Sequence, residues 1–271
     1  MIAVCIVTYN QEKYIAQAID SVLAQKCDEP VRIYIGDDTS TDGTQTICER
    51  YAAQNPNIVY VRRAQNMGLV DNTLDLYRHI MEDGCEFIAM LDGDDYWIKE
   101  DKLQIQLDYL RSHPQVGFVH TAAYDDIDGQ LVDADSADKP TGDIRLQYNR
   151  GGASHTNSTV VFRTSLLHNG DLQELEKQHF LVLDYPLYGI FSQHTEFGYL
   201  YIYTAAWRKH NSVSHPKALS TLLRYQFHYV RAWHWLDKKY PNHFHFHWYR
   251  AFLWYLWQFF YFLFAYIKKK L

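Results

Sequence analysis

The sequence lacks any closely spaced pair of cysteines, although the chain is 271 residues long. Its four cysteines stand at positions 5, 27, 48 and 85, outside any CxxC motif and away from histidine pairs. This spacing argues against a disulfide framework and against a zinc site, and it favours reduced thiols. The opening residues, "MIAVCIVTYN", also lack the basic flank and the cleavage site of a signal peptide. We therefore expect a cytoplasmic protein.

Acidic residues are almost absent from the last quarter of the chain. Residues 205–271 contain 11 lysines and arginines but only one acidic residue, Asp237, whereas residues 1–204 contain 31 acidic and 15 basic residues. The formal net charge of −6 therefore combines −16 in the first part with +10 in the second. The acidic body argues against nucleic acid as a partner, and the basic end predicts a second surface with a different partner.

Short β-branched runs alternate with longer amphipathic stretches in the first half of the chain. This alternation predicts a parallel sheet covered by helices on both faces, with ligands bound outside the carboxyl ends of its strands. The predicted strands are 2–8, 31–37, 58–63, 87–91 and 116–122, and the predicted helices are 12–26, 42–54, 70–82 and 99–112.

Polar residues follow four of these strands at the point where each strand ends. Because the carboxyl ends of parallel strands meet at one edge of a sheet, we expect the four clusters to form a single binding edge. They are Thr8-Tyr9-Asn10, Asp37-Asp38, Asn66-Met67-Gly68 and Asp92-Gly93-Asp94-Asp95.

The stretch "LDGDDYW", residues 91–97, places three carboxylates within four positions at the end of a buried strand. Such oxygen ligands suit Mg²⁺ or Mn²⁺, and Mg²⁺ commonly shares one or two carboxylates with the phosphates of a substrate. An EF-hand is excluded because Trp97 occupies the position of the loop glycine, and no GxxxxGK[ST] P-loop occurs. The cluster therefore predicts a phosphorylated ligand, with a solvated acidic turn as the alternative.

Four motifs in order, "VTYN" (7–10), "DDTSTDGT" (37–44), "NMG" (66–68) and "LDGDDYW", together resemble the inverting family 2 glycosyltransferases. Downstream, "STVVFR" (158–163), "LDYPLYG" (183–189) and "WRKHNSVSH" (207–215) resemble the acceptor strand, the catalytic-aspartate helix and the closing histidine loop of that family. The resemblance implies an α/β fold of the GT-A type, Rossmann-like, with a mostly parallel central sheet flanked by helices. It covers residues 1–215 as one domain and leaves 216–271 as a helical, aromatic and basic tail.

The resemblance also implies roles for individual residues. Asp38 would bond the N–H edge of the nucleobase, and Asp92 would bond the ribose or a metal-bound water. Asp94 would be the main ligand of Mn²⁺ or Mg²⁺, and Asp95 would face the donor sugar. The residues placed at the nucleotide are Thr8, Tyr9, Asn10, Asp37, Asp38, Asn66, Gly68 and Asp92.

The same comparison makes Asp184 the general base and His210 a ligand of the metal or the diphosphate. The base motif reads "LDYP" where an acidic pair or Gly-Asp is commoner, and a helix cap is the alternative for Asp184. His210 could instead be a solvated residue, with Arg208 and Lys209 contacting the diphosphate. His155 could touch the acceptor or lie on a surface loop.

The implied reaction moves a sugar from a nucleoside-diphosphate sugar, most often a UDP-sugar, to a hydroxyl of a glycan or lipid-linked acceptor. The resemblance suggests a role in bacterial surface polysaccharide synthesis, and the absent QxxRW signature favours single-residue addition. Two alternatives remain open. One is sugar transfer to a polyprenyl phosphate, and the other is a non-catalytic nucleotide-sugar-binding protein or membrane scaffold.

Residues 244–266 contain 14 aromatic side chains in 23 positions, and three lysines, Lys268–Lys270, follow shortly after. The uncharged run 251–267 would be about 26 Å long as a helix, which is shorter than a hydrocarbon core of roughly 30 Å. Aromatic and basic residues favour the headgroup region, so we expect an anchor lying on the inner face of the cell membrane. Packing on the body or a partner subunit and a true membrane span are the alternatives. Residues 220–240 predict an amphipathic helix beside this segment.

Overall fold

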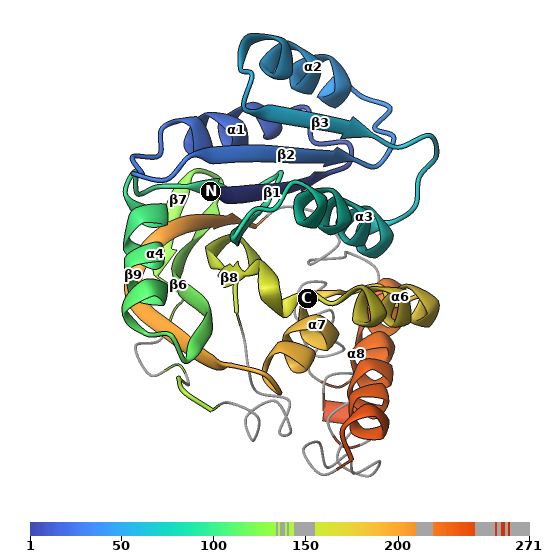
Figure 1. Cartoon of the computed structure of the whole chain (residues 1–271). Coiled ribbons are helices and arrows are strands. Elements are labelled where there is room, and N and C mark those ends of the chain that lie inside the picture. The colour runs from blue at the N-terminus through green and yellow to red at the C-terminus, as the bar shows by residue number, and fades with distance from the viewer. Residues whose placement is uncertain are drawn as a thin grey trace.

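The computed structural model describes residues 1–133, 135, 139, 141–143, 155–209 and 219–241, with positions 253, 256, 257 and 260 beyond them. Its strands form one sheet in the order β3-β2-β1-β4-β8-β6-β9-β5, and β7 pairs with β6 (Figure 1). Helices cover both faces of this sheet, as the alternation of strands and helices predicts.

The first half of the sheet is parallel. Strand β1 (Ile2–Thr8) lies between β2 (Val31–Asp37) and β4 (Phe87–Asp92), and β3 (Ile58–Arg62) extends the sheet beyond β2. All seven residues of β1 are buried, which is the continuous apolar pattern of a parallel strand covered on both faces.

The second half of the sheet is mixed, because it adds antiparallel strands to the mostly parallel sheet that the resemblance implies. Strand β8 (Val161–Arg163) pairs antiparallel with β4 and with β6 (Val116–Ile127), so it separates β6 from the parallel strands. Strand β9 (Glu196–Arg208) pairs parallel with β6. It also pairs antiparallel with the two-residue strand β5 (Tyr96–Trp97). The acidic stretch after residue 125 forms a hairpin between β6 and β7 (Gln130–Asp133).

Two hydrophobic clusters lie on opposite faces of the sheet. Helices α1 (Ile15–Leu23), α2 (Thr44–Gln54) and α4 (Lys102–Ser112) bury apolar side chains in one cluster. Helices α3 (Leu69–Glu82), α6 (Asn169–Gln178), α7 (Asp184–Phe191) and α8 (Leu219–Lys239) contribute to the other. Two 3-10 turns, η1 (Asn157–Thr159) and η2 (Thr164–Leu166), flank β8, and neither they nor α6 were predicted.

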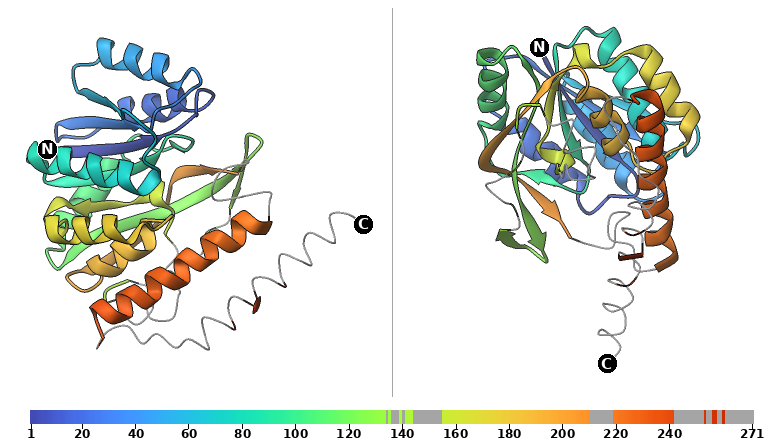
Figure 2. Two further views of the ribbon diagram at one scale, coloured as in Figure 1. Left: turned by 90° about the vertical axis from the view of Figure 1, so that its right-hand side faces the viewer. Right: turned by 90° about the horizontal axis from the view of Figure 1, so that it is seen from below.

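Helix α8 corresponds to the amphipathic helix predicted over 220–240, and it packs against α7 (Figure 2). The contact is close at Gly189, where an added Cβ atom would lie 2.5 Å from Cδ1 of Leu236. Ala232 and Leu236 belong to the same core cluster as α7, so the first part of the predicted tail packs on the body. The division at residue 215 stays a prediction. Among the described residues, no helix is both long and apolar enough to cross a bilayer.

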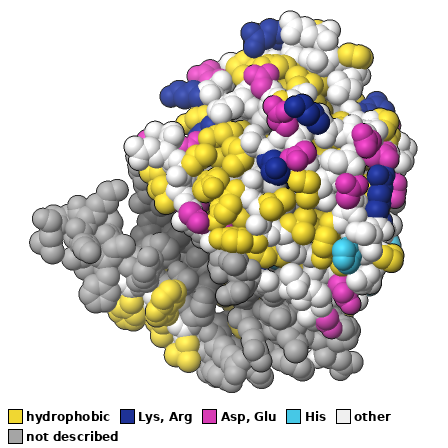
Figure 3. Space-filling model, turned by 90° about the vertical axis from the view of Figure 1, so that its left-hand side faces the viewer, with side chains coloured by type: hydrophobic (Ala, Val, Ile, Leu, Met, Phe, Trp, Pro, Cys, Tyr) yellow, Lys and Arg dark blue, Asp and Glu magenta, His cyan; other side chains and the backbone are white. Residues whose placement is uncertain are grey.

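The side of the molecule that carries α4 shows basic and acidic side chains lying next to one another (Figure 3). Lys26 pairs with Glu100, and Lys99 pairs with Asp101 at 3.0 Å. This intermixing of charge is typical of an ordinary solvated surface.

Candidate active site

The strand register brings three of the predicted clusters to one edge of the sheet. Thr8 at the end of β1 is the partner of Asp37 at the end of β2, and Val7 is the partner of Asp92 at the end of β4. The fourth cluster joins them because the backbone N–H groups of Met67 and Gly68 donate to the carboxylate of Asp38 at 2.6 and 2.8 Å. The four predicted clusters therefore lie together at one edge of the sheet, and the binding of a ligand there stays a prediction.

Asp38 is buried, and its carboxylate ties the loop after β3 to the loop after β2. Asn66 strengthens this link because its amide nitrogen donates to the carbonyl oxygen of Asp38 at 3.0 Å. Gly68 has φ +86°, a left-handed conformation that glycine adopts without strain. The contact of Asp38 with a nucleobase stays a prediction, and the observed bonds give this side chain a role in shaping the loop.

The loop after β1 presents one exposed ring beside fixed neighbours. Tyr9 is 47% exposed, so its ring is available to a ligand. Thr8 donates to Gln11 at 2.8 Å, and Asn10, at φ 54°, accepts a hydrogen bond from the backbone N–H of Thr41 at 2.7 Å. These hydrogen bonds hold the loop in place, and the Tyr9 ring remains exposed at the edge of the loop.

Asp37 is completely buried at the end of β2. Its carboxylate accepts hydrogen bonds from the backbone N–H of Ser40 at 2.8 Å and from the hydroxyl of Tyr60 at 2.7 Å. Burial and this bond to Asp37 raise the pKa of Tyr60. Asp37 therefore holds the loop after β2 against β3, and its role in nucleotide binding stays a prediction.

The loop between β4 and β5 carries Asp92, Asp94 and Asp95. Asp92 accepts a hydrogen bond from the side-chain amide of Asn157 at 2.8 Å. Burial, together with the charges of Asp94 and Asp184, raises the pKa of Asp92 to about 7. Gly93 allows the loop to pass close to β1, because an added Cβ atom would lie 2.4 Å from the side-chain oxygen of Gln11.

The third carboxylate of this loop does not share a ligand set with the other two. Asp95 is buried, and its two oxygens accept hydrogen bonds from the hydroxyl of Ser158 at 2.6 Å and from the backbone N–H of Arg208 at 3.0 Å. Burial, and then the charges of Asp92 and Asp94, raises its pKa well above the usual range. The geometry favours a structural role, and contact of Asp95 with the donor sugar stays a prediction.

The charge of Asp94 contributes to the raised pKa of Asp92, and a divalent cation between two such carboxylates would offset that repulsion. Their role as its ligands stays a prediction. Within the described part of the chain, no group of three or more histidine, cysteine, aspartate or glutamate side chains is arranged to hold a metal. One or two carboxylates completed by substrate phosphates are, however, the usual way in which proteins hold Mg²⁺. His210, the other predicted ligand, lies outside the described residues.

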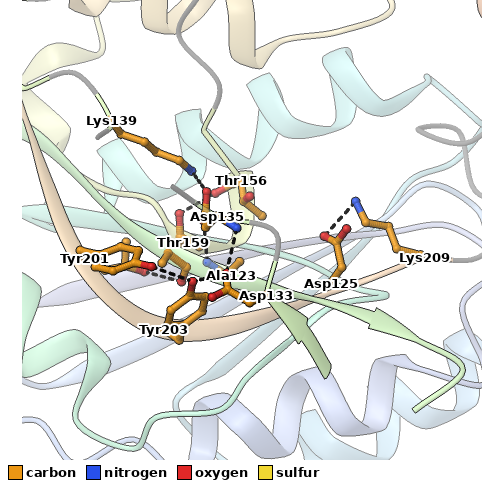
Figure 4. A network of polar contacts seen from close by, with 12 residues as sticks. Ala123, Asp125, Asp133, Asp135, Lys139, Thr156, Thr159, Tyr201, Tyr203 and Lys209 are labelled. Carbon is orange, nitrogen blue, oxygen red and sulfur yellow. Dashed lines mark hydrogen bonds and ion pairs between the residues drawn. The ribbon is translucent and has the colours of Figure 1, made fainter. Parts of the chain in front are cut away.

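The two cations beside this loop are already paired. The guanidinium of Arg208 lies over the rings of Tyr14 and Tyr96, at 4.6 and 4.9 Å from their centroids. Lys209 pairs with Asp125 of β6 at 3.0 Å, as the polar network in Figure 4 shows. Arg208 therefore fastens the end of β9 to the acidic loop, and Lys209 fastens it to β6. Their contact with a diphosphate stays a prediction.

Asp184 is the first residue of α7, the helix whose Tyr188 bonds Asn157, the partner of Asp92. Its charge contributes to the raised pKa of Asp92, and it is the largest cause of the raised pKa of Tyr229. Burial raises the pKa of Asp184 itself, although its own backbone N–H and that of Tyr185 donate to the carboxylate. The fold therefore brings the predicted base near the predicted donor site from a position 92 residues further along the chain.

Three residues of this site were not identified from the sequence. Asn157 and Ser158 of η1 bond the acidic loop, and the hydroxyl of Tyr188 donates to the side-chain oxygen of Asn157 at 2.7 Å. The polar run "HTNST" before an apolar strand is the signal that could have found the first two. His155 packs against the rings of His120 and Phe118, with centroids 4.2 and 5.3 Å away, and its contact with an acceptor stays a prediction.

A family model described as Glycosyl transferase family 2 matches residues 3–168. The chain belongs to glycosyl transferase family 2. The match contains all four strand-end clusters and η1, and α7 lies after it. Among curated relatives, the family 2 sequence is 34% identical over 105 residues to the dTDP-rhamnosyl transferase RfbG of Shigella flexneri. That alignment covers 38% of this chain and 36% of RfbG, so the chain spans about a third of that relative.

Solved structures with the same architecture support the GT-A-like fold of this family 2 chain. Staphylococcus aureus TarS in complex with UDP-GlcNAc has a TM-score of 0.64 at 19% identity, covering 92% of this chain and 69% of the TarS chain. A mannosyltransferase from Pyrobaculum calidifontis in complex with GDP-Man and Mn²⁺ has a TM-score of 0.58 at 18% identity, covering 88% and 64%. At these identities the likeness shows the fold alone.

Proposed function

We propose that this protein transfers a sugar from a nucleoside-diphosphate sugar to a hydroxyl of a glycan or lipid-linked acceptor in bacterial surface polysaccharide synthesis. The observation that supports the proposal is that Asp38 and Asp92 follow β2 and β4 on either side of β1, while α7, which begins at Asp184, reaches Asp92 through Tyr188 and Asn157. Membership of family 2 supports the reaction class. The donor we favour is a UDP-sugar, and the structural relative solved with UDP-GlcNAc supports that choice.

Different residues of the chain act on the donor and on the acceptor. Tyr9 stacks on the nucleobase, the loops joined by Asp38 enclose the nucleotide, and Asp92 orients the ribose or a bound water. Asp184 accepts the proton of the acceptor hydroxyl, whose oxygen attacks the anomeric carbon from the face opposite the departing diphosphate. Attack from that face inverts the configuration at the anomeric carbon.

Asp94, with Asp92, would hold Mn²⁺ or Mg²⁺ beside the diphosphate of the donor. When bound, such a cation neutralises the negative charge that develops on the leaving group. The ion pairs of Lys209 with Asp125 at 3.0 Å and of Arg208 with Asp126 at 3.6 Å support this assignment, because each of the two cations already faces a carboxylate of β6.

Nucleotide binding tests this proposal without knowledge of the acceptor. We expect UDP with MnCl₂ to raise the melting temperature of the full chain, because a ligand at 100 times its Kd stabilises the folded state by about 2.7 kcal/mol. The measurement is a thermal-shift series with UDP, GDP and dTDP, each with and without MnCl₂. MnCl₂ alone and inorganic phosphate serve as controls. The absence of a shift with every nucleotide would contradict the proposal.

Peripheral binding to the inner face of the cell membrane is the second part of the proposal. Helix α8 supports it, because its exposed residues Arg224, Phe227, His234 and Lys238 follow one another at spacings of three, seven and four. These spacings place the four side chains on one face of the helix, and none of them is acidic. Basic and aromatic side chains on one helix face suit the headgroups of anionic lipids.

The described positions of the tail include exposed apolar side chains. Leu253, Trp257 and Phe260 are 60%, 59% and 49% exposed, and their spacings of four and three place them on one helix face. The acidic body would be repelled by anionic lipid, so the charge distribution favours an orientation with this end toward the bilayer.

We expect the full chain to sediment with vesicles that contain phosphatidylglycerol and much less with pure phosphatidylcholine. Reversing two charges on α8, in the double variant R224E/K238E, should weaken this binding at least about tenfold, since each cation near an anionic surface contributes about 1 kcal/mol. The matched control is K26E/K99E, which reverses two charges on the side that carries α4. Equal binding by both double variants would rule out α8 as the contact.

A further inference from the structure

We infer that Asn157 is a positioning residue that couples the donor side of the active site to the acceptor side through Tyr188. This inference rests on the proposed function. The side-chain amide of Asn157 contacts both sides: its nitrogen donates to Asp92 at 2.8 Å, and its oxygen accepts from the hydroxyl of Tyr188 at 2.7 Å. We call the path Tyr188–Asn157–Asp92 the amide bridge.

The amide bridge begins one helical turn from the predicted base. Tyr188 and Asp184 both lie on α7, four residues apart, and residues at that spacing are neighbours on the surface of a helix. Tyr188 is 2% exposed, so its hydroxyl needs an internal partner, and Asn157 provides it. A shift of Asn157 would therefore be transmitted to the helix that carries Asp184.

The other end of the amide bridge is fixed just as firmly. Ser158, the next residue, donates to Asp95 at 2.6 Å and accepts the backbone N–H of Asp92 at 3.2 Å. Its carbonyl oxygen accepts the indole N–H of Trp97 at 2.8 Å. The 3-10 turn thus holds the acidic loop through two consecutive side chains, and only Asn157 also reaches α7.

The chemistry of the amide explains why asparagine suits this position. An amide offers a donor and an acceptor together, so it can satisfy an ionised carboxylate on one side and a hydroxyl on the other. Aspartate at position 157 would place two carboxylates against each other, and alanine would leave both partners without this bond. Reacting groups must be held within a fraction of an ångström, and a misplacement of 1 Å costs about 10²-fold in rate.

The test is a double-mutant cycle on the full chain with Y188F and N157A. Turnover is measured as release of nucleoside diphosphate from UDP-, GDP- and dTDP-sugars with MnCl₂, using the donor that the wild-type chain turns over fastest. We expect Y188F to lower kcat about two- to tenfold with an unchanged donor KM, and N157A to lower kcat about 10- to 100-fold. The double variant should match N157A within about twofold, because the Tyr188 hydroxyl acts only through Asn157.

A buried hydroxyl outside the bridge provides the matched control. Tyr77 is 1% exposed, and its hydroxyl donates to the sulfur of Met90 at 3.2 Å. Y77F should lower the melting temperature about as much as Y188F while leaving kcat unchanged. Effects of Y188F and N157A that multiply in the double variant, or equal kcat values for Y188F and Y77F, would overturn the inference.

A readout besides turnover separates this inference from the proposed function. N157A should weaken the binding of UDP in the presence of MnCl₂, measured by calorimetry, because Asp92 loses its fixed position; Y188F should bind UDP like the wild type. A wild-type chain that turns over no donor would contradict the proposed function. A wild-type chain that is active while N157A binds and turns over substrate normally would contradict the bridge alone.

Discussion

Replacing Asp184 with asparagine is expected to lower kcat by about 10²- to 10⁴-fold, the usual contribution of a general base. Asparagine keeps the shape of the side chain but cannot accept the proton of the acceptor hydroxyl. Binding of UDP with MnCl₂ should persist, because Asp184 begins α7 and belongs to none of the loops assigned to the nucleotide. The measurement is kcat for transfer, with nucleotide affinity determined in parallel.

The same variant should be more stable than the wild type at neutral pH. Burial raises the pKa of Asp184 in the folded chain above its value in the unfolded chain. A carboxyl group of this kind contributes stability below its unfolded pKa, and that contribution is lost as pH rises through its folded pKa. Removing the charge should therefore raise the melting temperature.

In the wild type, kcat should fall as pH is lowered through the raised pKa of Asp184, because the base must be ionised.

Asp171 offers a matched control, since it is also a carboxylate in the first turn of a helix, α6, and it pairs with Lys239 at 3.0 Å. D171N should keep its activity. Full activity in D184N would instead favour transfer to a polyprenyl phosphate, whose acceptor oxygen needs no strong base.

The strand-end clusters could be predicted from the sequence because each depends on a local pattern. A continuous apolar run followed by polar residues marks the end of a buried strand, and the rule that parallel strands share an edge then brings the clusters together. The register of Thr8 with Asp37 and of Val7 with Asp92 follows from that rule. Asp184 could be placed only through the family resemblance, since no periodic pattern connects α7 to β4.

The supporting residues could not be predicted because they depend on contacts between distant segments. Asn157 lies 65 residues from Asp92, and the 3-10 turn that carries it is only three residues long. Strand β8 is equally short, so its sequence carries no signal of its antiparallel direction. The hydrogen bonds that Asp95 accepts from Ser158 and from the backbone of Arg208 likewise join segments 63 and 113 residues apart, so no local pattern predicts them.

Replacing Asp94 with asparagine is expected to lower kcat/KM by at least about 10²-fold, since a bound cation supplies several kcal/mol of charge stabilisation to the leaving group. The family resemblance makes Asp94 the main ligand of the cation, so its loss should affect the cation more directly than the loss of Asp92 or Asp95. The measurement is turnover over a range of MnCl₂ concentrations.

D94N should also lose the part of the UDP thermal shift that depends on MnCl₂, while the part that UDP produces alone remains. D101N is the control, because Asp101 is an exposed carboxylate near the same loop and pairs only with Lys99 in the described part of the chain. If the activity of D94N depends on MnCl₂ as that of the wild type does, residues other than Asp94 hold the cation. If UDP binds but neither the wild type nor D94N turns over any donor, the protein is a nucleotide-sugar-binding scaffold, because an enzyme requires turnover that depends on Asp94 and on Mn²⁺.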